Sequence, residues 1–217
     1  MMIAALYVDV ERGPYGPLGC DLWGVERDAR EYAGPWPVVA HPPCQRWGNF
    51  WWSDGSSEPG HDGGCFAAAV DAVNRYGGVL EHPRSSRAWA AFGLRKPKGY
   101  GWAPAGPRRW VGHVDQACYG HPCRKPTWLY YVGGERPEDI LPARKFDGEI
   151  KVWVASGPGG ITSEERAAKG IKLLSKRDSH ITPRNFAIAL VALAGGGMDP
   201  MIGTSTALVG GCRSGDR

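Results

Sequence analysis

Two side chains with complementary chemistry follow two short apolar runs of this 217-residue chain. Cys44 comes after residues 37–40 (PVVA), and Glu81 ends the run 78–81 (GVLE). Residues just past neighbouring strand ends of an open α/β sheet point into one crevice. A thiolate placed there can add to an electron-poor ring, while a carboxyl group hydrogen-bonds the ring nitrogen that gains charge. A single cysteine is more commonly a small buried hydrophobe, so Cys44 needs further support.

That support comes from four motifs in a familiar order. Segment 42–45 (PPCQ) resembles the nucleophile motif of cytosine-5 DNA methyltransferases, and 81–83 (EHP) sits where that family carries Glu-Asn-Val or Glu-Asn-Pro. Segment 119–125 (YGHPCRK) is similar to the family's Tyr-Gly-Val-Pro-Gln-x-Arg-x-Arg stretch, and 181–184 (ITPR) to its Leu-Thr-Pro-Arg element. The resemblance spans residues 21 to about 190.

The resemblance implies a role for each matching residue. Cys44 would attack C6 of a cytosine that has left the duplex, and Glu81 would hold its Watson–Crick edge and favour protonation at N3. Arg124, the third expected catalytic residue, would support the loop or pair with a phosphate near the flipped base. The expected substrate-binding residues at the motifs are Pro43, Gln45, His82 and Lys125. Two of the motif positions depart from the family, because His82 replaces its Asn and Cys123 its Gln.

The cofactor that the resemblance implies is S-adenosylmethionine. Its expected contacts are Asp9, Asp28 and Glu26, with Glu26 at the ribose. The family opens with Asp-Leu-Phe-x-Gly-x-Gly, whereas no Gly-x-Gly follows residues 6–10 (LYVDV) here. We therefore expect a compact, phage-like member with an eroded cofactor motif. Methyl transfer is the default chemistry, and transfer of another one-carbon unit is a variant.

The charge distribution favours a polyanionic partner. The net charge is only +4, but the segment between residues 84 and 126 has one acid, Asp115, among many cations. Aromatic residues in the same segment, Tyr100, Trp102 and Trp110, could stack on bases while the cations neutralise phosphates. We therefore expect DNA to be the partner, and Arg108 and Arg109 to contact it. The cations are Arg84, Arg87, Arg95, Lys96, Lys98, Arg108, Arg109, Arg124 and Lys125.

Hydrophobic periodicity predicts the elements that position these residues. Short strands are expected at 3–9, 37–40, 78–81, 110–114, 127–132 and 150–154, with helices at 65–76, around 86–92 and after Pro183. Strands that alternate with helices indicate an α/β fold, which we expect to be a truncated, loop-rich, methyltransferase-like (Rossmann-like) open sheet. Residues 1–195 are expected to form one catalytic-like domain, and the Gly, Ser and Thr-rich stretch 196–217 a flexible, disordered tail.

Two further hypotheses stay open beside a methyltransferase-like transferase. The first is a catalytically inactive relative that binds DNA or protein. The second is a metal-dependent protein that uses the pairs His41/Cys44, His61/Cys65 and His121/Cys123, although no Cys-x2-Cys pair is present and we predict no metal site. No apolar stretch is long enough to span a membrane and no secretory signal is evident, so we expect reduced thiols and a cytoplasmic protein of a bacterium or phage-infected host.

Overall fold

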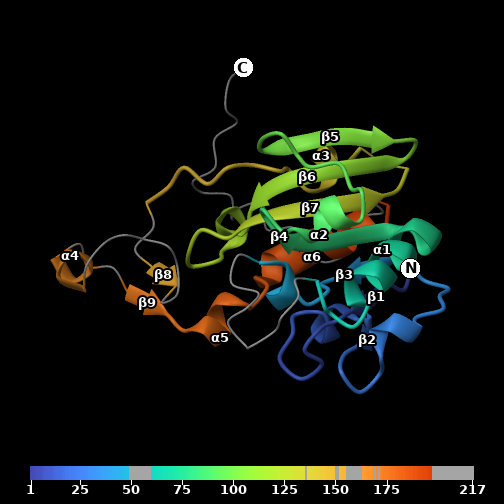
Figure 1. Cartoon of the computed structure of the whole chain (residues 1–217), viewed down its shortest axis with the longest axis horizontal. Coiled ribbons are helices and arrows are strands. Elements are labelled where there is room, and N and C mark those ends of the chain that lie inside the picture. Colours follow the sequence, from blue (N-terminus) through green and yellow to red (C-terminus); the bar gives the residue numbers. More distant parts are fainter. Residues whose placement is uncertain are drawn as a thin grey trace.

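Short apolar runs in the first part of the chain form the parallel half of one central sheet. The computed structural model describes residues 1–48, 60–134, 136–149, 152–154, 163–168, 170 and 172–196. Four strands lie side by side in the order β2-β1-β3-β4, and all of them are parallel (Figure 1). Their bounds are Asp21–Trp23 (β2), Ala4–Leu6 (β1), Val38–Ala40 (β3) and Gly78–Pro83 (β4).

The other half of the sheet is an antiparallel ladder. Strand β7 (Pro126–Val132) pairs with β4, β6 (Arg109–Asp115) pairs with β7, and β5 (Gly101–Gly106) forms the outer edge. The seven strands make a mixed, open α/β sheet with parallel strands in its interior, which confirms the α/β part of the predicted fold class.

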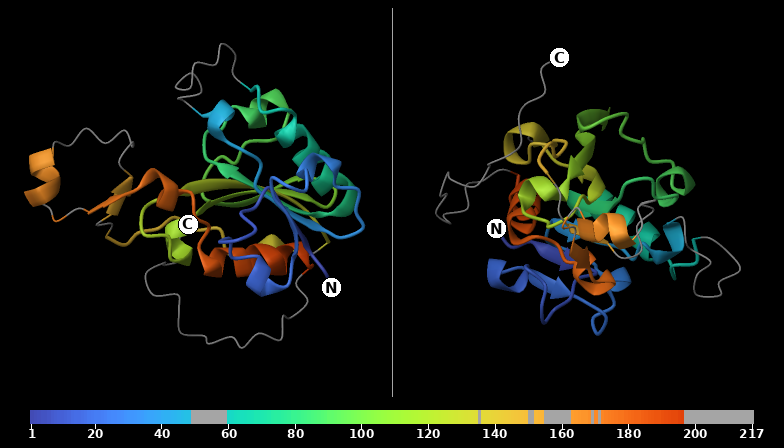
Figure 2. Two further views of the ribbon diagram at one scale, coloured as in Figure 1. Left: turned by 90° about the horizontal axis from the view of Figure 1, so that it is seen from below. Right: turned by 90° about the vertical axis from the view of Figure 1, so that its left-hand side faces the viewer.

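Helices cover both faces of this sheet (Figure 2). On one face, α1 (Cys65–Tyr76) and α2 (Ala88–Ala91) bury Phe66, Val73 and Trp89, and on the other α3 (Pro137–Ile140) and α6 (Arg184–Ala194) lie over the core around Leu190. Four 3-10 turns join these elements: η1 (Gly16–Leu18), η2 (Ala29–Glu31), η3 (Gln45–Trp47) and η4 (Gln116–Tyr119). The remaining elements are β8 (Val152–Val154), α4 (Ser163–Ala168), β9 (Lys172–Leu174) and α5 (Lys176–Ser179), with β8 and β9 paired in a separate parallel sheet.

The alternation of side chains along β4 decides which residues can share a site. Val79 packs in the core on the α6 side, and Leu80 in the core on the α1 side. Successive residues of a strand point to opposite faces. Glu81 therefore faces the α6 side, while His82 faces the α1 side and meets the ring of Phe66 edge-on at 5.0 Å.

Most predicted elements are present, but three strands, β2, β5 and β9, were not predicted. The helix at 65–76 is confirmed, as are strands near all the predicted positions. Residues 101–106 (GWAPAG), which lie in the basic segment 84–126 where no strand was predicted at this position, form the edge strand β5. Glycine and proline are poor strand formers, but proline is tolerated on an edge strand, where one side of the backbone needs no partner. The predicted tail from residue 197 onwards lies outside the described residues.

The buried His82 predicts a loss of stability in acid. Its side chain is fully buried, and this burial lowers its pKa from 6.5 to about 4. Between pH 6.5 and 4, His82 is therefore protonated in the unfolded chain and neutral in the folded protein. The free energy of unfolding thus falls as the pH falls through this window. At about 1.4 kcal/mol per pKa unit, the loss is about 3 kcal/mol by pH 4.

Urea unfolding at several pH values tests this expectation. His82→Leu should flatten the pH dependence between 6.5 and 4, since leucine fills an apolar site without titrating. The same substitution at the exposed His61 is the control for loss of a histidine and should not reproduce the effect. An unchanged slope in His82→Leu would show that other groups cause the acid lability.

Candidate active site

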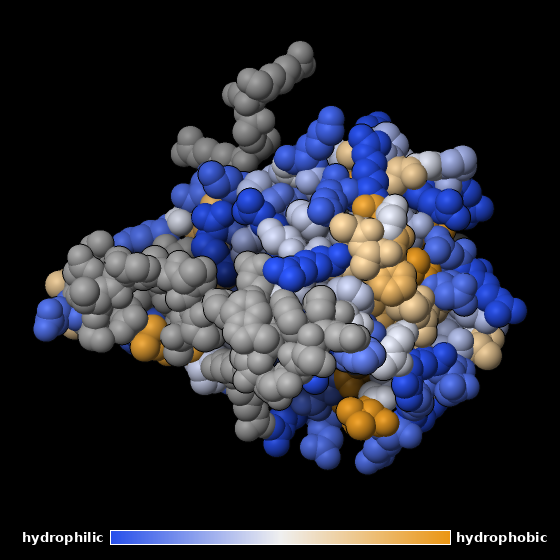
Figure 3. Space-filling model, viewed as in Figure 1, coloured by the Kyte–Doolittle hydropathy of each residue, from blue (hydrophilic) through white to orange (hydrophobic). Residues whose placement is uncertain are grey.

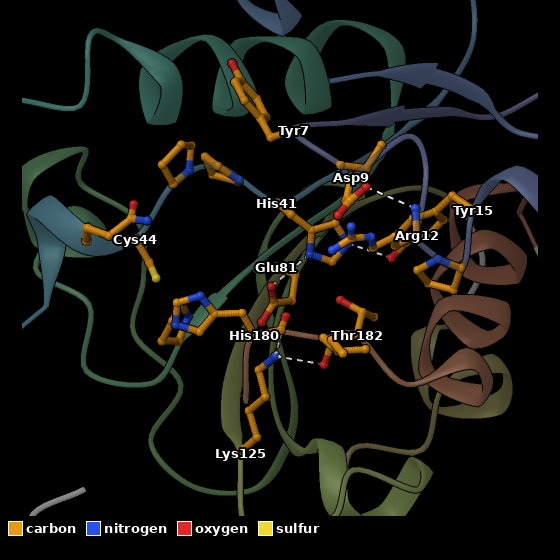
Figure 4. A pocket seen from close by; sticks show the side chains of 18 residues that line it. Tyr7, Asp9, Arg12, Tyr15, His41, Cys44, Glu81, Lys125, His180 and Thr182 are labelled. Carbon is orange, nitrogen blue, oxygen red and sulfur yellow. Dashed lines mark hydrogen bonds and ion pairs between the residues drawn. The ribbon is translucent and has the colours of Figure 1, made fainter. Parts of the chain in front are cut away.

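A cavity of about 590 Å³ opens at the carboxyl ends of β1, β3 and β4. The chain runs from β1 to β2 on one side and returns to β3 on the other, so this is where the strand order reverses. Ligands of open α/β sheets bind at such a switch point. Figure 4 shows side chains from these strand ends converging on the cavity. Its lining residues are Tyr7, Val8, Asp9, Arg12, Gly13, Pro14, Tyr15, His41, Pro42, Pro43, Cys44, Gln45, Glu81, Pro83, Lys125, His180, Ile181 and Thr182.

Cys44 enters this cavity from the end of β3. Two prolines, Pro42 and Pro43, precede it and restrict the backbone, and η3 begins directly after it. Its side chain is half-buried, and its thiol is free. Burial raises the pKa of Cys44, the charge of Glu81 raises it further, and the ammonium group of Lys125 acts in the opposite direction.

Glu81 reaches the cavity from β4 as a carboxylate held by two donors. One oxygen lies 2.9 Å from Nδ1 of His41, and the other accepts from Nε2 of Gln116 at 3.1 Å. Burial by itself would raise the pKa of Glu81, but the hydrogen bond from His41, the electrostatic interaction with His41 and the charge of Lys125 outweigh it and hold the pKa at about 2. At neutral pH the group is therefore an anion that only accepts hydrogen bonds.

Lys125 closes the cavity from the start of β7. Its Nζ donates to the carbonyl oxygens of His180 and Ile181 at 3.2 and 3.3 Å, which ties the segment before α6 to the cavity. Burial lowers the pKa of Lys125, and the negative charges of Glu81 and Cys44 raise it. The ammonium group thus lies within electrostatic range of both predicted catalytic side chains.

Six of the predicted site residues line the cavity and six do not. The cavity contains Cys44, Glu81, Pro43, Gln45, Lys125 and Asp9. Outside it lie Arg124, His82, Arg108, Arg109, Glu26 and Asp28.

His82 and the two arginines of the β5–β6 turn are directed away from the cavity by the sheet. His82 lies on the opposite face of β4 from Glu81, as described above. Arg109 is in register with Val132, and Val132 with Gly78, so the turn at Arg108 and Arg109 lies beside the amino end of β4. The cavity lies at the carboxyl end of β4, so the turn and the cavity are at opposite ends of the strands.

Arg124 is engaged in a structural ion pair. Its Nε donates to the carboxylate of Asp115, which is completely buried, and its guanidinium also reaches the hydroxyl of Tyr100 at 3.3 Å. Asp115 accepts from the backbone N–H groups of Ala117 and Lys125 as well. This arrangement fixes the loop that carries Lys125, so Arg124 supports the site from outside the cavity.

The ion pair predicts that Arg124→Ala acts mainly on stability. Removing the exposed arginine leaves the buried carboxylate of Asp115 without its cation, and we expect a loss of about 1–3 kcal/mol in urea unfolding. Adding Asp115→Asn to this variant should recover part of the loss, because the buried charge is then gone. A stability change below about 1 kcal/mol, together with loss of activity, would return Arg124 to a catalytic role.

The acids expected to bind S-adenosylmethionine do not form a common site. The carboxylate of Asp9 is used within its own loop, where it accepts from the N–H groups of Glu11 and Arg12 at 3.0 Å. Asp28 caps η2 and pairs with Arg30, Glu26 is exposed, and neither lines the cavity. Of the three acids predicted to bind the cofactor, only Asp9 therefore lines the cavity, and its carboxylate is already engaged by its own loop.

The loop after β1 also lacks the open backbone of a nucleotide cradle. A Cβ atom added to Gly13 would lie 2.3 Å from the carbonyl oxygen of Asp9, so the glycine lets this loop close on itself. In a cradle, a glycine instead lets the ligand approach the backbone. This observation agrees with the absence of a Gly-x-Gly motif directly after residues 6–10.

Three residues that hold Glu81, two directly and one through a neighbour, were not predicted as site residues. His41 and Gln116 hold Glu81, and the hydroxyl of Tyr15 lies 2.5 Å from Nε2 of His41. His41 was considered only as part of a metal pair, although its position directly before the Pro-Pro-Cys motif was a signal. Both of its ring nitrogens have partners, so His41 is not free to act as a base for the Cys44 thiol.

Most of the described cysteines have free thiols. Cys20, Cys44, Cys65 and Cys123 are free, as predicted, whereas Cys118 is bonded in a disulfide. Within the described ranges, His, Cys, Asp and Glu side chains nowhere gather in threes as metal ligands, and no helix has the length and apolar character to cross a membrane. Neither models of known protein families nor curated proteins match this chain.

Proposed function

We propose that this protein is an enzyme that modifies cytosine, or a related pyrimidine, in DNA at C5 through a covalent bond between Cys44 and C6. One observation carries the proposal: Cys44 and Glu81, from neighbouring parallel strands, line the same cavity at the switch point of the sheet. The resemblance of the motifs around both residues to cytosine-5 DNA methyltransferases supports it. The methyltransferase-like identity of the fold is part of this proposal.

The chemistry of addition follows from the groups in the cavity. The Cys44 thiol loses its proton and its sulfur bonds to C6. The C5–C6 π pair forms a C4–C5 double bond, and N3 receives the displaced C4–N3 π pair together with a proton from solvent. The anionic Glu81 accepts hydrogen bonds from the exocyclic amino group and from the protonated N3. Lys125 lies where its charge favours the thiolate over the thiol. The adduct makes C5 nucleophilic, so that C5 can bond to the electrophilic carbon of the donor. C5 then loses its hydrogen as a proton, sulfur departs from C6 with its electron pair, and N3 loses its proton, which restores the aromatic ring.

S-adenosylmethionine is the default donor in this proposal, because the resemblance to the methyltransferase family implies it. S-adenosylmethionine would supply an electrophilic methyl group to C5. Because Asp9, Glu26 and Asp28 do not converge, no residue is assigned to it, and another one-carbon donor is the variant.

Cations beside the cavity support DNA as the substrate. Arg84 directly follows the lining residue Pro83 and is exposed, and Arg124 directly precedes Lys125. Hydrophilic residues cover most of the described surface on the side shown in Figure 3, interrupted by a few apolar areas, the broadest of them to the right of centre. A target base must leave the duplex to enter such a cavity, at a cost of a few kcal/mol that phosphate contacts offset. The proposal places the protein in the cytoplasm of a bacterium or phage-infected host.

Nucleoside mass analysis of DNA from cells that express the protein tests the proposal, with Cys44→Ser in parallel. A new 5-methylcytosine that is absent with the variant supports methyl transfer. A different Cys44-dependent base supports the nucleophile and replaces the donor. Unmodified DNA in both samples, with soluble protein confirmed, contradicts the proposal.

The second candidate is a catalytically inactive relative that binds DNA. The specific observation in its favour is that only Asp9 of the three expected cofactor acids lines the cavity. Equilibrium binding to duplex DNA separates the two, because an inactive binder needs its cations and not its thiol. Binding that survives Cys44→Ser but not Arg84→Ala, without any modified base, would favour this candidate.

A further inference from the structure

A continuous chain of hydrogen bonds runs from the buried Tyr15 through His41 to Glu81. The Tyr15 hydroxyl lies 2.5 Å from Nε2 of His41, and Nδ1 of the same ring lies 2.9 Å from Glu81. In Figure 4 His41 lies between the other two residues, at the centre of the cavity wall. Tyr15 is only 2% exposed, and its ring also contacts that of His41 at 5.4 Å.

The partners of Glu81 define the direction of these hydrogen bonds. An ionised carboxylate only accepts, so Nδ1 of His41 carries the hydrogen that points to Glu81. In the neutral ring Nε2 is then an acceptor, and the Tyr15 hydroxyl donates to it. Tyr15 thereby selects the ring tautomer that can hold the carboxylate.

A second series of hydrogen bonds, through Thr127 and Gln116, holds the other carboxylate oxygen of Glu81. The Thr127 hydroxyl donates to the carbonyl oxygen of Lys125, so its oxygen is left to accept from Nε2 of Gln116 at 2.9 Å. That contact directs the amide nitrogen of Gln116, and not its oxygen, towards Glu81. Each carboxylate oxygen thus receives one protein donor and keeps acceptor capacity for a ligand.

We propose that His41 and Tyr15 are positioning residues: His41 holds Glu81 as an oriented, acceptor-only carboxylate, and Tyr15 acts through His41 by setting its tautomer. The role in turnover rests on the proposed function, whereas the hold on Glu81 can be measured without any substrate. Neither residue touches the reacting atoms.

The electrostatic surroundings of Glu81 give the hold a measurable consequence. Besides His41, the titratable groups that face or influence Glu81 are Lys125, His82, Cys44 and Tyr15. Burial favours the protonated carboxyl, and the hydrogen bond from His41 is the strongest opposing contribution. Removing that donor should therefore raise the pKa of Glu81.

The test is a carbon-13 NMR titration of the Glu81 carboxyl group, assigned with Glu81→Gln, in three variants. His41→Leu removes the donor, and we expect the titration midpoint to move up by more than one pH unit. His41→Asn keeps an N–H near the position of Nδ1 and should largely restore the wild-type midpoint. Tyr15→Phe keeps the ring and loses the tautomer-setting hydroxyl, so an intermediate shift is expected. Wild-type midpoints in both His41→Leu and Tyr15→Phe would overturn the proposal.

A kinetic arm separates this inference from the proposed function. Exchange of the cytosine C5 hydrogen in heavy water should show a lower turnover number with a nearly unchanged KM in Tyr15→Phe, and rescue by His41→Asn relative to His41→Leu. If the wild-type protein exchanges no hydrogen, the proposed function fails, while the titration still decides whether His41 holds Glu81. A variant that does not fold is replaced by Tyr15→Phe, which removes a single oxygen atom.

Discussion

Cys44→Ser is expected to abolish exchange of the cytosine C5 hydrogen with solvent, by about three orders of magnitude or more. Addition of sulfur to C6 is what makes C5 basic enough to take up deuterium, and a serine hydroxyl is a far weaker nucleophile at neutral pH. The measurement is the mass gain of deoxycytidine after incubation of duplex DNA with purified protein in heavy water. It needs no methyl donor, so it tests the nucleophile independently of the cofactor.

A matched control distinguishes loss of the nucleophile from loss of any thiol. Cys65 is also a free, half-buried cysteine, but it begins α1 and does not line the cavity. Cys65→Ser should therefore exchange cytosine hydrogen at the wild-type rate. Equal rates for Cys44→Ser and the wild-type protein would remove Cys44 from the mechanism.

Glu81→Gln is expected to lower the same exchange rate by about 100- to 1,000-fold. The amide is nearly isosteric, but it carries no charge to stabilise a protonated N3. The amide also carries an NH2 group, which would face a hydrogen-bond donor, because His41 and Gln116 both direct hydrogens at this position. Unsatisfied buried donors cost about 1–3 kcal/mol, so urea unfolding should show a loss of stability in this range.

The control for Glu81→Gln is the same acid-to-amide change on the surface. Asp71 is exposed on α1, far in the fold from the strand ends, and Asp71→Asn should change neither the rate nor the stability. A Glu81→Gln protein with the wild-type exchange rate would show that the carboxylate does not bind the base. The cavity would then need another recognition group.

The pairing of Cys44 with Glu81 was predictable because it depends on local order along the chain. Each residue follows a short apolar run, and parallel neighbouring strands bring their carboxyl ends to one edge of the sheet. The helix at 65–76 was predictable for the same kind of reason, since its apolar spacing and the glycine that ends it are local signals. Register was not needed for either inference.

The sequence could not place the basic residues. A cluster of cations between residues 84 and 126 looked like one surface, yet β5 and β6 form a hairpin within it. The turn of that hairpin places Arg108 and Arg109 at the end of the strands away from the cavity. Lys125 lines the cavity, and Arg124 lies beside it. The alternation of side chains along β4 likewise separates His82 from Glu81, because neighbouring residues of a strand point to opposite faces of the sheet.

Periodicity and spacing along the chain were enough to predict that Cys44 and Glu81 meet at the carboxyl ends of neighbouring strands, and that an α/β sheet brings them there. Only the tertiary structure decided what surrounds them. Tyr15, His41 and Gln116 come from three separate segments, and no local pattern relates them to Glu81. Their hydrogen bonds depend on distances between strand ends and loops, which arise when the sheet and its two helical layers pack together.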